Sequence, residues 1–254
     1  MQEYFKYLNQ YYDKIYILTL PRLTARIENC KKIFAGLNFE FFYGIDKLNT
    51  SLEELSLKNI YDLKDYQTIY KKPATMPLGM LCCSLGHVGI YESIIKNGYK
   101  KTLILEDDAF PIETSMQYFS QVMNELPANW ELVYLGYEKN EQKGLKEKIK
   151  TIFYSLFPFH TKLNLNRKIY SNFYPEKISS HIAKAGFHDC THAYAITLEA
   201  AKKLLQQQQP VKFHPDNLLS FMICSNLLNG YIVRPKFFNQ LSAFTHQTES
   251  LTSD

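Results

Sequence analysis

The sequence predicts an α/β fold built on a mainly parallel, twisted sheet. Apolar runs of strand length alternate along the chain with stretches that have the 3.6-residue period of a helix packed on one face. One such run, residues 101–105, stops on three consecutive acids, Glu106, Asp107 and Asp108, as expected where a buried strand reaches the ligand-binding edge of an open sheet. The 254 residues, 46% of them hydrophobic, suffice for a single domain over residues 1–254.

The N-terminal part of the chain is typical of a strand–helix–strand unit. Residues 14–20 form the first predicted strand, a helix follows to about residue 35, and Gly36 stands at its stop position. The second predicted strand, residues 39–43, ends at Gly44-Ile45-Asp46. Two strands joined through a helix favour a parallel pair. Residues 47–76 are polar with weak periodicity, which predicts short helices and loops.

The longest predicted helix covers residues 77–97, with a proline in its first turn and Gly98 at its end. Ser84, His87 and Tyr91 share one face of this helix, at spacings that bring them within reach of one ligand. The alternative is a solvated polar face, which surface helices commonly show.

The three acids after residue 105 have two interpretations. Adjacent carboxylates repel one another, and their oxygens are the ligands that Mg²⁺ and Mn²⁺ prefer, so the cluster indicates a divalent cation. The alternative is that Asp107 and Asp108 only solvate a strand end and cap a helix that begins near Thr114.

A helix at about residues 115–125 and a strand at 130–136 complete a doubly wound nucleotide-binding pattern. The glycine-rich dinucleotide fingerprint and the P-loop are both absent from the sequence. If a nucleotide binds, a metal and side chains must therefore hold its phosphates.

The pattern breaks at residues 137–186, which we interpret as an insertion. Between Lys143 and Lys177 there are eight Lys or Arg and two Glu, interleaved with aromatic residues such as Phe153 and Phe159, and Pro158 interrupts any helix there. This mixture suits a phosphorylated glycolipid or an anionic membrane surface. The alternative is a solvated connector with its own small core.

The predicted fold resumes with a strand at residues 188–197 and a helix at 198–207. His192 lies near the strand end beside Asp189 and Thr191, which makes it a candidate site residue, although a lone histidine is more often structural. Pro215 and Asp216 are predicted to start another helix. A last strand is expected at residues 231–235, and the polar end, residues 247–254, is expected to be loose.

Composition narrows the class of protein. The formal charge of +4 is too small and too scattered for a nucleic-acid binder. The five cysteines have no C-x-x-C spacing and are expected to be reduced core thiols, and 19 Tyr with 17 Phe suggest aromatic surfaces. No signal peptide is visible and no run approaches a membrane span, so we expect a cytoplasmic protein, with contact to the inner face of the membrane left open.

The motifs, in chain order, resemble glycosyltransferase family 25, the lipooligosaccharide galactosyltransferase-like family related to the collagen galactosyltransferases. The resemblance covers the chain from Lys14 to about Leu241. It is carried by Ile17–Arg22 with Arg26, Phe41–Asp46, Leu78–His87, Ile104–Asp108, Trp130–Gly136, Thr191–Thr197 and the Pro215-Asp216 step. Thr19, Cys83 and Gly86 depart from the family pattern, and residues 137–186 match no family motif.

The resemblance implies a GT-A-like nucleotide-sugar-binding fold and an inverting transferase. The expected donor is a UDP-sugar, foremost UDP-galactose, the expected cofactor is Mn²⁺ or Mg²⁺, and the acceptor is a hydroxyl of a lipooligosaccharide or another glycan. Asp108, with Glu106, is the expected metal ligand. Glu106 or Asp107 is expected to assist through a water or the ribose hydroxyls.

The remaining roles follow from the same chemistry. Arg22 and Arg26 are expected to add charge at the departing diphosphate, and Asp46, Ser84 and His87 to orient the nucleotide. Inversion in one step needs a base on the acceptor side, for which Asp216 is predicted, with His192 and His214 as competitors. The N-terminus of its helix is expected to lower the pKa of Asp216.

The sequence is also compatible with two other classes of protein. A metal-dependent phosphodiesterase or hydrolase also uses clustered acids and histidines, but the histidines here lack the spacing of a metal pair. A non-catalytic glycan-binding module would account for the aromatic residues and gives no reason for the acids.

Overall fold

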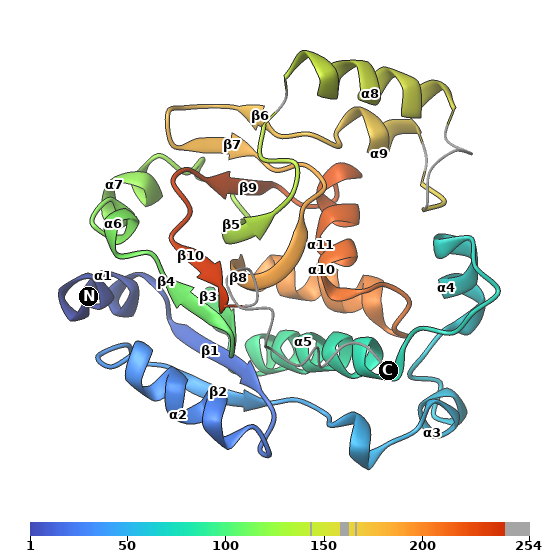
Figure 1. The fold of residues 1–254 in the computed structure, drawn as a ribbon, viewed down its shortest axis with the longest axis horizontal. Helices are drawn as coiled ribbons and strands as arrows, with labels where there is room; N and C mark the ends of the chain where they lie inside the picture. Colours follow the sequence, from blue (N-terminus) through green and yellow to red (C-terminus); the bar gives the residue numbers. More distant parts are fainter. Residues whose placement is uncertain (143, 158–162, 166, 242–254) are drawn as a thin grey trace.

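The computed structural model of the protein describes residues 1–142, 144–157, 163–165 and 167–241 (Figure 1). A sheet of eight strands, in the order β2-β1-β3-β8-β5-β9-β7-β6, runs through the molecule. The strands are β1 (Lys14–Thr19), β2 (Glu40–Tyr43), β3 (Lys101–Glu106), β5 (Leu132–Glu138), β6 (Glu176–Lys177), β7 (Ile182–Lys184), β8 (Asp189–Thr197) and β9 (Gly230–Val233). A separate antiparallel pair consists of β4 (Ala109–Pro111) and β10 (Phe238–Gln240).

The sheet is mixed. β2, β1 and β3 pair in parallel, as predicted for strands joined through helices. β8 runs antiparallel to both of its neighbours, β3 and β5, and β7 runs antiparallel to β9 and β6. Apart from β7 and β8, the strands of the sheet all run in one direction. The predicted α/β class is thus confirmed. Because β3 and β5 are both antiparallel to β8, they end at the same edge of the sheet.

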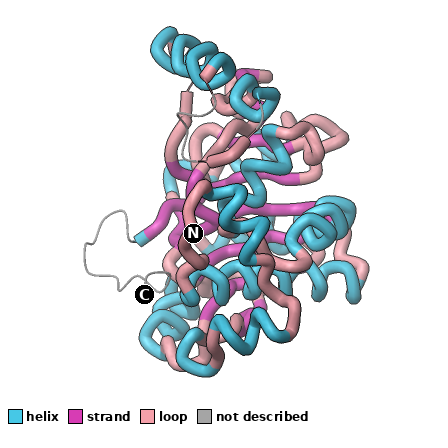
Figure 2. Tube along the Cα trace, turned by 90° about the vertical axis from the view of Figure 1, so that its right-hand side faces the viewer, coloured by secondary structure: helices cyan, strands magenta, loops and turns pink. Residues whose placement is uncertain are grey.

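Helices cover both faces of this sheet, as Figures 1 and 2 show. The helices are α1 (Gln2–Tyr11), α2 (Thr24–Ile33), α3 (Leu52–Leu57), α4 (Leu63–Tyr70), α5 (Leu78–Asn97), α6 (Glu113–Met116), α7 (Phe119–Asn124), α8 (Leu145–Leu156), α9 (Arg167–Ser171), α10 (Leu198–Gln208) and α11 (Pro215–Cys224), with a 3₁₀ turn, η1 (Lys47–Asn49). One core joins α1, α2 and α7 to the sheet, and a second joins α5, α10 and α11 to its other face.

Helix α5 follows the prediction closely. It begins after Pro77 and ends at Gly98, whose φ of 71° is the left-handed conformation that glycine adopts at a helix end. Gly86 and Gly89 allow α5 to approach the sheet, because a Cβ would lie 3.0 Å from Leu18 Cδ1 at the first position and 2.9 Å from Phe42 Cζ at the second.

The length and mean hydropathy of α5 would allow this helix to cross a membrane. The expectation that no run of residues approaches the length of a membrane span is therefore wrong by these two criteria. In the fold, however, α5 packs between the sheet and α10, which is the position of a core helix.

Several elements differ from the sequence predictions. Helix α1 was not expected, and the predicted helix at residues 115–125 is two short helices, α6 and α7. Most tyrosines are buried, so the expectation of aromatic surfaces is largely wrong. Residues 137–186 contain α8, α9, β6 and β7, and because β7 pairs with β9 the last part of this segment belongs to the sheet. The predicted loose end, residues 247–254, and Pro158 and Phe159 lie outside the described residues.

Candidate active site

The three acids lie at the carboxyl end of β3 and in the turn before β4, and each has a different environment. Asp107 has both carboxylate oxygens engaged: Arg26 Nη1 lies 2.7 Å from Oδ1, and the Thr19 hydroxyl donates to Oδ2 at 2.7 Å. The Cys30 thiol donates to the main-chain carbonyl of Asp107 at 3.2 Å. Asp107 therefore ties the turn to β1 and α2, and Arg26 compensates its charge.

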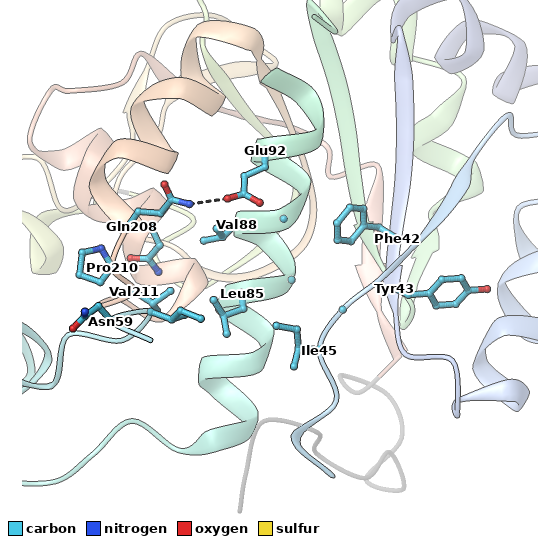
Figure 3. Close-up of a pocket in the computed structure, with 15 residues that line it drawn as sticks. Phe42, Tyr43, Ile45, Asn59, Leu85, Val88, Glu92, Gln208, Pro210 and Val211 are labelled. Atoms are coloured by element: carbon cyan, nitrogen blue, oxygen red, sulfur yellow. Dashed lines mark hydrogen bonds between the residues drawn. The ribbon is translucent and has the colours of Figure 1, made fainter. Parts of the chain in front are cut away.

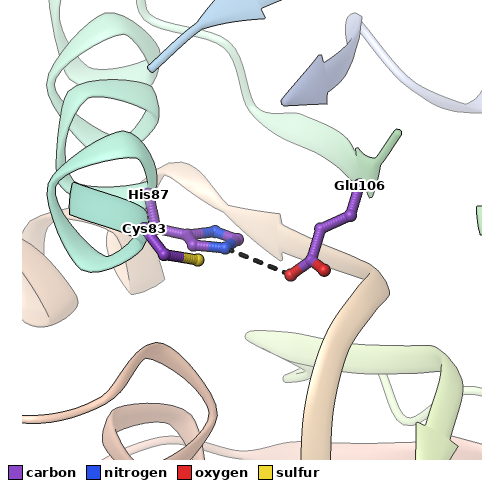
Figure 4. A group of neighbouring side chains, drawn as sticks. All are labelled: Cys83, His87 and Glu106. Atoms are coloured by element: carbon purple, nitrogen blue, oxygen red, sulfur yellow. Dashed lines mark ion pairs between the residues drawn. The ribbon is translucent and has the colours of Figure 1, made fainter. Parts of the chain in front are cut away.

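Glu106 faces α5. The Thr191 hydroxyl donates to Glu106 Oε1, and His87 Nε2 lies 3.5 Å from the same oxygen (Figure 4). Burial raises the pKa of Glu106, but the imidazole of His87 and the Thr191 hydroxyl outweigh it and hold this pKa below its usual value. Cys83, one turn before His87, completes a group whose ligand atoms all lie within 4.8 Å of one another. This group has the donor types of a metal site.

Asp108 has an unused ligand atom. Its Oδ2 accepts a hydrogen bond from Gln240 Nε2 at 2.8 Å, whereas its buried Oδ1 has no hydrogen-bond partner among the described residues. Burial, together with the charges of Glu106 and Asp107, raises the pKa of Asp108 to about 7. An unpaired buried carboxylate oxygen is costly, and a bound cation would remove that cost. The environment of Asp108 therefore fits a divalent cation.

Asp46 and Arg22 form an ion pair at the end of β2. The other carboxylate oxygen of Asp46 accepts a hydrogen bond from the Leu48 main-chain nitrogen at 3.1 Å and so caps η1. Asp46 is buried, whereas the Arg22 side chain is 37% exposed. The structure therefore gives Asp46 a role in holding Arg22 and the turn after β2, and its predicted role toward a nucleotide stays a prediction.

The predicted face of α5 is buried, so the alternative of a solvated polar face is wrong. Ser84 donates to the main-chain carbonyl of Phe213 at 3.1 Å, which ties α5 to the segment before α11. His87 Nδ1 lies 2.8 Å from the Tyr194 hydroxyl, and the Tyr91 hydroxyl lies 3.1 Å from the same group. His87 and Tyr91 thus converge on Tyr194, and of the three predicted residues only His87 reaches the acids.

Asp216 lies in the first turn of α11, as predicted, and its carboxylate accepts a hydrogen bond from the Asn217 main-chain nitrogen at 2.8 Å. Burial, with the charges of Asp189 and Glu106, raises the pKa of Asp216 to about 6. The expectation that the helix N-terminus lowers this pKa is wrong, because the loss of hydration outweighs the helix dipole. A raised pKa suits a general base that works near neutral pH.

The two competing histidines, His192 and His214, have environments that lower their pKa values. His192 is fully buried, both of its ring nitrogens lack a hydrogen-bond partner among the described residues, and burial lowers its pKa. His214 stacks on Tyr70 with 4.5 Å between ring centroids, and burial lowers its pKa to about 4. The choice of a general base among Asp216, His192 and His214 stays a prediction.

Gly136 makes room for His192, and this close contact supports a prediction. A Cβ at Gly136 would lie 2.3 Å from His192 Nε2 and 2.8 Å from the main-chain oxygen of Phe238. Because that oxygen belongs to the backbone, we expect Gly136→Ala to lower the free energy of unfolding by about 1–3 kcal/mol in denaturant titrations. The control is Gly44→Ala, whose Cβ would meet Leu18 at 3.4 Å, an ordinary contact. Equal stability of the two variants would contradict the prediction.

A cavity of about 620 Å³ lies beside α5, between the end of β2 and the segment that follows α10 (Figure 3). Leu85, Gly86 and Gly89 line it. At about 100° per helical residue these positions lie across α5 from Cys83 and His87, which face Glu106. The cavity is therefore separate from the acids.

The structure adds residues that the sequence predictions did not assign to the site. The thiol of Cys83 joins His87 and Glu106, and the spacing of four residues between Cys83 and His87 was the signal available in the sequence. Gln240, which binds Asp108 from β10, had no such signal. The prediction of core thiols holds for Cys30, Cys82 and Cys224, whereas Cys83 and Cys190 are half-buried.

Comparisons with known protein families and individual proteins show which family this chain resembles. The model of "Glycosyltransferase family 25 (LPS biosynthesis protein)" matches residues 12–219. A glycosyltransferase 25 family member of Anopheles gambiae is 30% identical over 219 residues, which are 82% of this chain and 31% of that protein. Procollagen galactosyltransferase 1-A of Xenopus laevis is 24% identical, over 87% of this chain and 32% of that protein.

A third relative, the probable inactive glycosyltransferase 25 family member 3 of Bos taurus, is 26% identical over 63% of this chain and 23% of that protein. The chain thus spans about a third or less of the length of these relatives. The family model nevertheless covers most of the chain, and it includes the acids, the α5 residues and Asp216. The chain therefore belongs to glycosyltransferase family 25.

Proposed function

We propose that this protein is an inverting, metal-dependent glycosyltransferase with a GT-A-like arrangement. It transfers a hexose, foremost galactose, from a UDP-sugar to a hydroxyl of a lipooligosaccharide or another glycan. Membership of the family supports sugar transfer, and the similarity to procollagen galactosyltransferases supports galactose. The cytoplasmic location stays a prediction.

The observation that carries the proposal is the buried, unpartnered Oδ1 of Asp108 beside Glu106 at the carboxyl end of β3. Asp108 and Glu106 would hold Mn²⁺ or Mg²⁺, for which hard oxygen ligands are suited. The bound cation supplies positive charge that stabilises the departing diphosphate. Asp107 already has Arg26 and Thr19 as partners, so we assign it to positioning this turn.

The other residues act on the two substrates. Arg26, which pairs with Asp107, and Arg22, which pairs with Asp46, would supply positive charge toward the departing diphosphate. Asp216 accepts the proton of the attacking acceptor hydroxyl, on the side of α11. Because the charges of Glu106 and Asp189 contribute to the raised pKa of Asp216, this base lies within electrostatic reach of the acidic cluster.

Thermal unfolding with a panel of UDP-, GDP- and CMP-sugars tests the donor. At a donor concentration one hundred times the dissociation constant, selective binding is expected to raise Tm by about 5–10 °C for a domain of this size. We expect this shift with UDP-galactose and Mn²⁺, and little shift when EDTA replaces the metal. Equal stabilisation in EDTA would contradict the metal-dependent site, and stabilisation by CMP- or GDP-sugars alone would contradict the donor class.

A further inference from the structure

Helix α8 carries an apolar surface that the described part of the molecule leaves uncovered. It lies at one extremity of the protein in both Figure 1 and Figure 2, beyond α9. Four large apolar side chains on it are more than half exposed: Leu145 (77%), Ile149 (60%), Ile152 (61%) and Leu156 (55%). We call these four residues the outer face of α8. Single exposed apolar residues are ordinary, but a contiguous set of this kind indicates a contact surface.

Helical geometry shows that the outer face points away from the protein. At about 100° per residue, the four side chains fall within a sector roughly 60° wide. Thr151 and Tyr154 lie on the opposite side of α8, where both are half-buried. The Tyr154 ring packs against Tyr170 of α9, with 6.0 Å between centroids. Helix α8 is therefore anchored through one side and presents its apolar stripe on the other.

Lysines border the stripe on both sides. On the same helical projection Lys148 flanks one edge of the outer face and Lys146 flanks the other, and Lys150 lies further round the helix on the side of Lys146. All three are exposed. Glu147, the acid of this helix, lies on the inner side, where its carboxylate accepts a hydrogen bond from the Gly144 main-chain nitrogen. The exposed side of α8 thus combines a narrow apolar stripe with positive charge alone.

From this arrangement we infer that α8 docks the protein onto an anionic lipid bilayer. An apolar stripe flanked by lysines is the pattern of a helix that lies in the plane of the membrane interface, with its apolar side chains among the acyl chains and its cations at the headgroups. Lysine stems reach past apolar surface to place their charges in the headgroup layer. Each cation near an anionic surface strengthens binding about fivefold.

The position of α8 suits this contact. It follows β5, which ends at the same edge of the sheet as β3 and its acids. In Figure 1 it lies beyond β6 and β7, the last strands of the sheet, where no other element of the described structure covers its outer face. The inference concerns binding alone, so its test does not depend on the proposed transferase activity.

Vesicle sedimentation without donor or metal tests the inference. We expect the full chain to bind vesicles of equal parts phosphatidylglycerol and phosphatidylcholine at low salt, to release as salt rises, and to leave pure phosphatidylcholine largely unbound. Replacing the outer face with serine (Leu145→Ser, Ile149→Ser, Ile152→Ser and Leu156→Ser together) should lower the partition coefficient at least ~tenfold. Replacing Lys146, Lys148 and Lys150 with glutamine should lower it roughly a hundredfold.

Matched controls separate the outer face from general surface properties. Leu48 and Leu57 are 70% and 79% exposed elsewhere, so Leu48→Ser with Leu57→Ser should leave binding unchanged. Lys6→Gln, Lys64→Gln and Lys96→Gln remove the same charge from exposed positions outside α8, and should have a smaller effect than the α8 lysines. Unchanged Tm of the outer-face variant would show that it is folded.

A direct readout comes from Ile152→Trp, whose emission should shift to shorter wavelength with anionic vesicles. Absence of vesicle binding at any salt concentration, or unchanged binding of the outer-face variant, would overturn the inference. It would also be overturned if the protein formed dimers that the outer-face variant abolishes and did not bind vesicles, since the occupant of α8 would then be a second copy of the chain.

Discussion

Asp108→Asn is expected to abolish metal-dependent donor binding and to reduce sugar transfer by at least ~100-fold, the scale of effect when one group that stabilises transition-state charge is lost. The amide has lost the negative charge that a divalent cation requires, while its size and its contact with Gln240 can be kept. Because burial and neighbouring acids disfavour the charge of Asp108, the variant should be at least as stable as the parent protein without metal.

Two measurements check this result: titration with Mn²⁺ and UDP-galactose by calorimetry, and thermal unfolding without either. The control is Glu28→Gln, which removes an exposed carboxylate that pairs with Lys31 one helical turn away. A variant with normal metal affinity and normal transfer would move the cation to Glu106 with Cys83 and His87, a second group of metal-ligand atoms among the described residues.

Asp216→Asn is expected to lower kcat by 10²–10⁴-fold, the usual contribution of a general base, with donor binding unchanged. In the parent protein, kcat should rise as pH increases through about 6. The sign follows from the group: below this pKa the carboxyl is protonated and cannot accept the proton of the acceptor hydroxyl. In the Asp216→Asn variant, kcat should no longer rise as pH increases through about 6.

Assays at saturating donor, acceptor and metal isolate this step. The control is Asp65→Asn, another carboxylate in the first turn of a helix, which is 51% exposed and pairs with Lys212 at the surface. A kcat of Asp216→Asn within a few-fold of the parent, with an unchanged pH profile, would transfer the role of base to His192 or His214.

Three elements, strands β1 and β3 and helix α5, form where the sequence predicts them. Residues 14–19 and 101–106 form strands and residues 78–97 a helix because their apolar periods, with Pro77 and Gly98, act locally. The resemblance to the family was likewise carried by short local motifs. Helix α1 and the pairing of β10 with β4 were missed, since their stability comes from contacts with distant parts of the chain.

The sequence by itself determined strands β1 and β3, helix α5, the family and the position of the acids at a strand end. The tertiary structure decided what each acid does. Asp107 is held by Thr19 and Arg26, residues at least 81 positions earlier, whereas Asp108 keeps an unpartnered oxygen. It also reversed the expected pKa shift of Asp216. The physical reason is that burial and the distances between charges depend on how segments remote in sequence pack together. Burial and these distances determine the pKa of each carboxyl and whether its oxygens have hydrogen-bond partners.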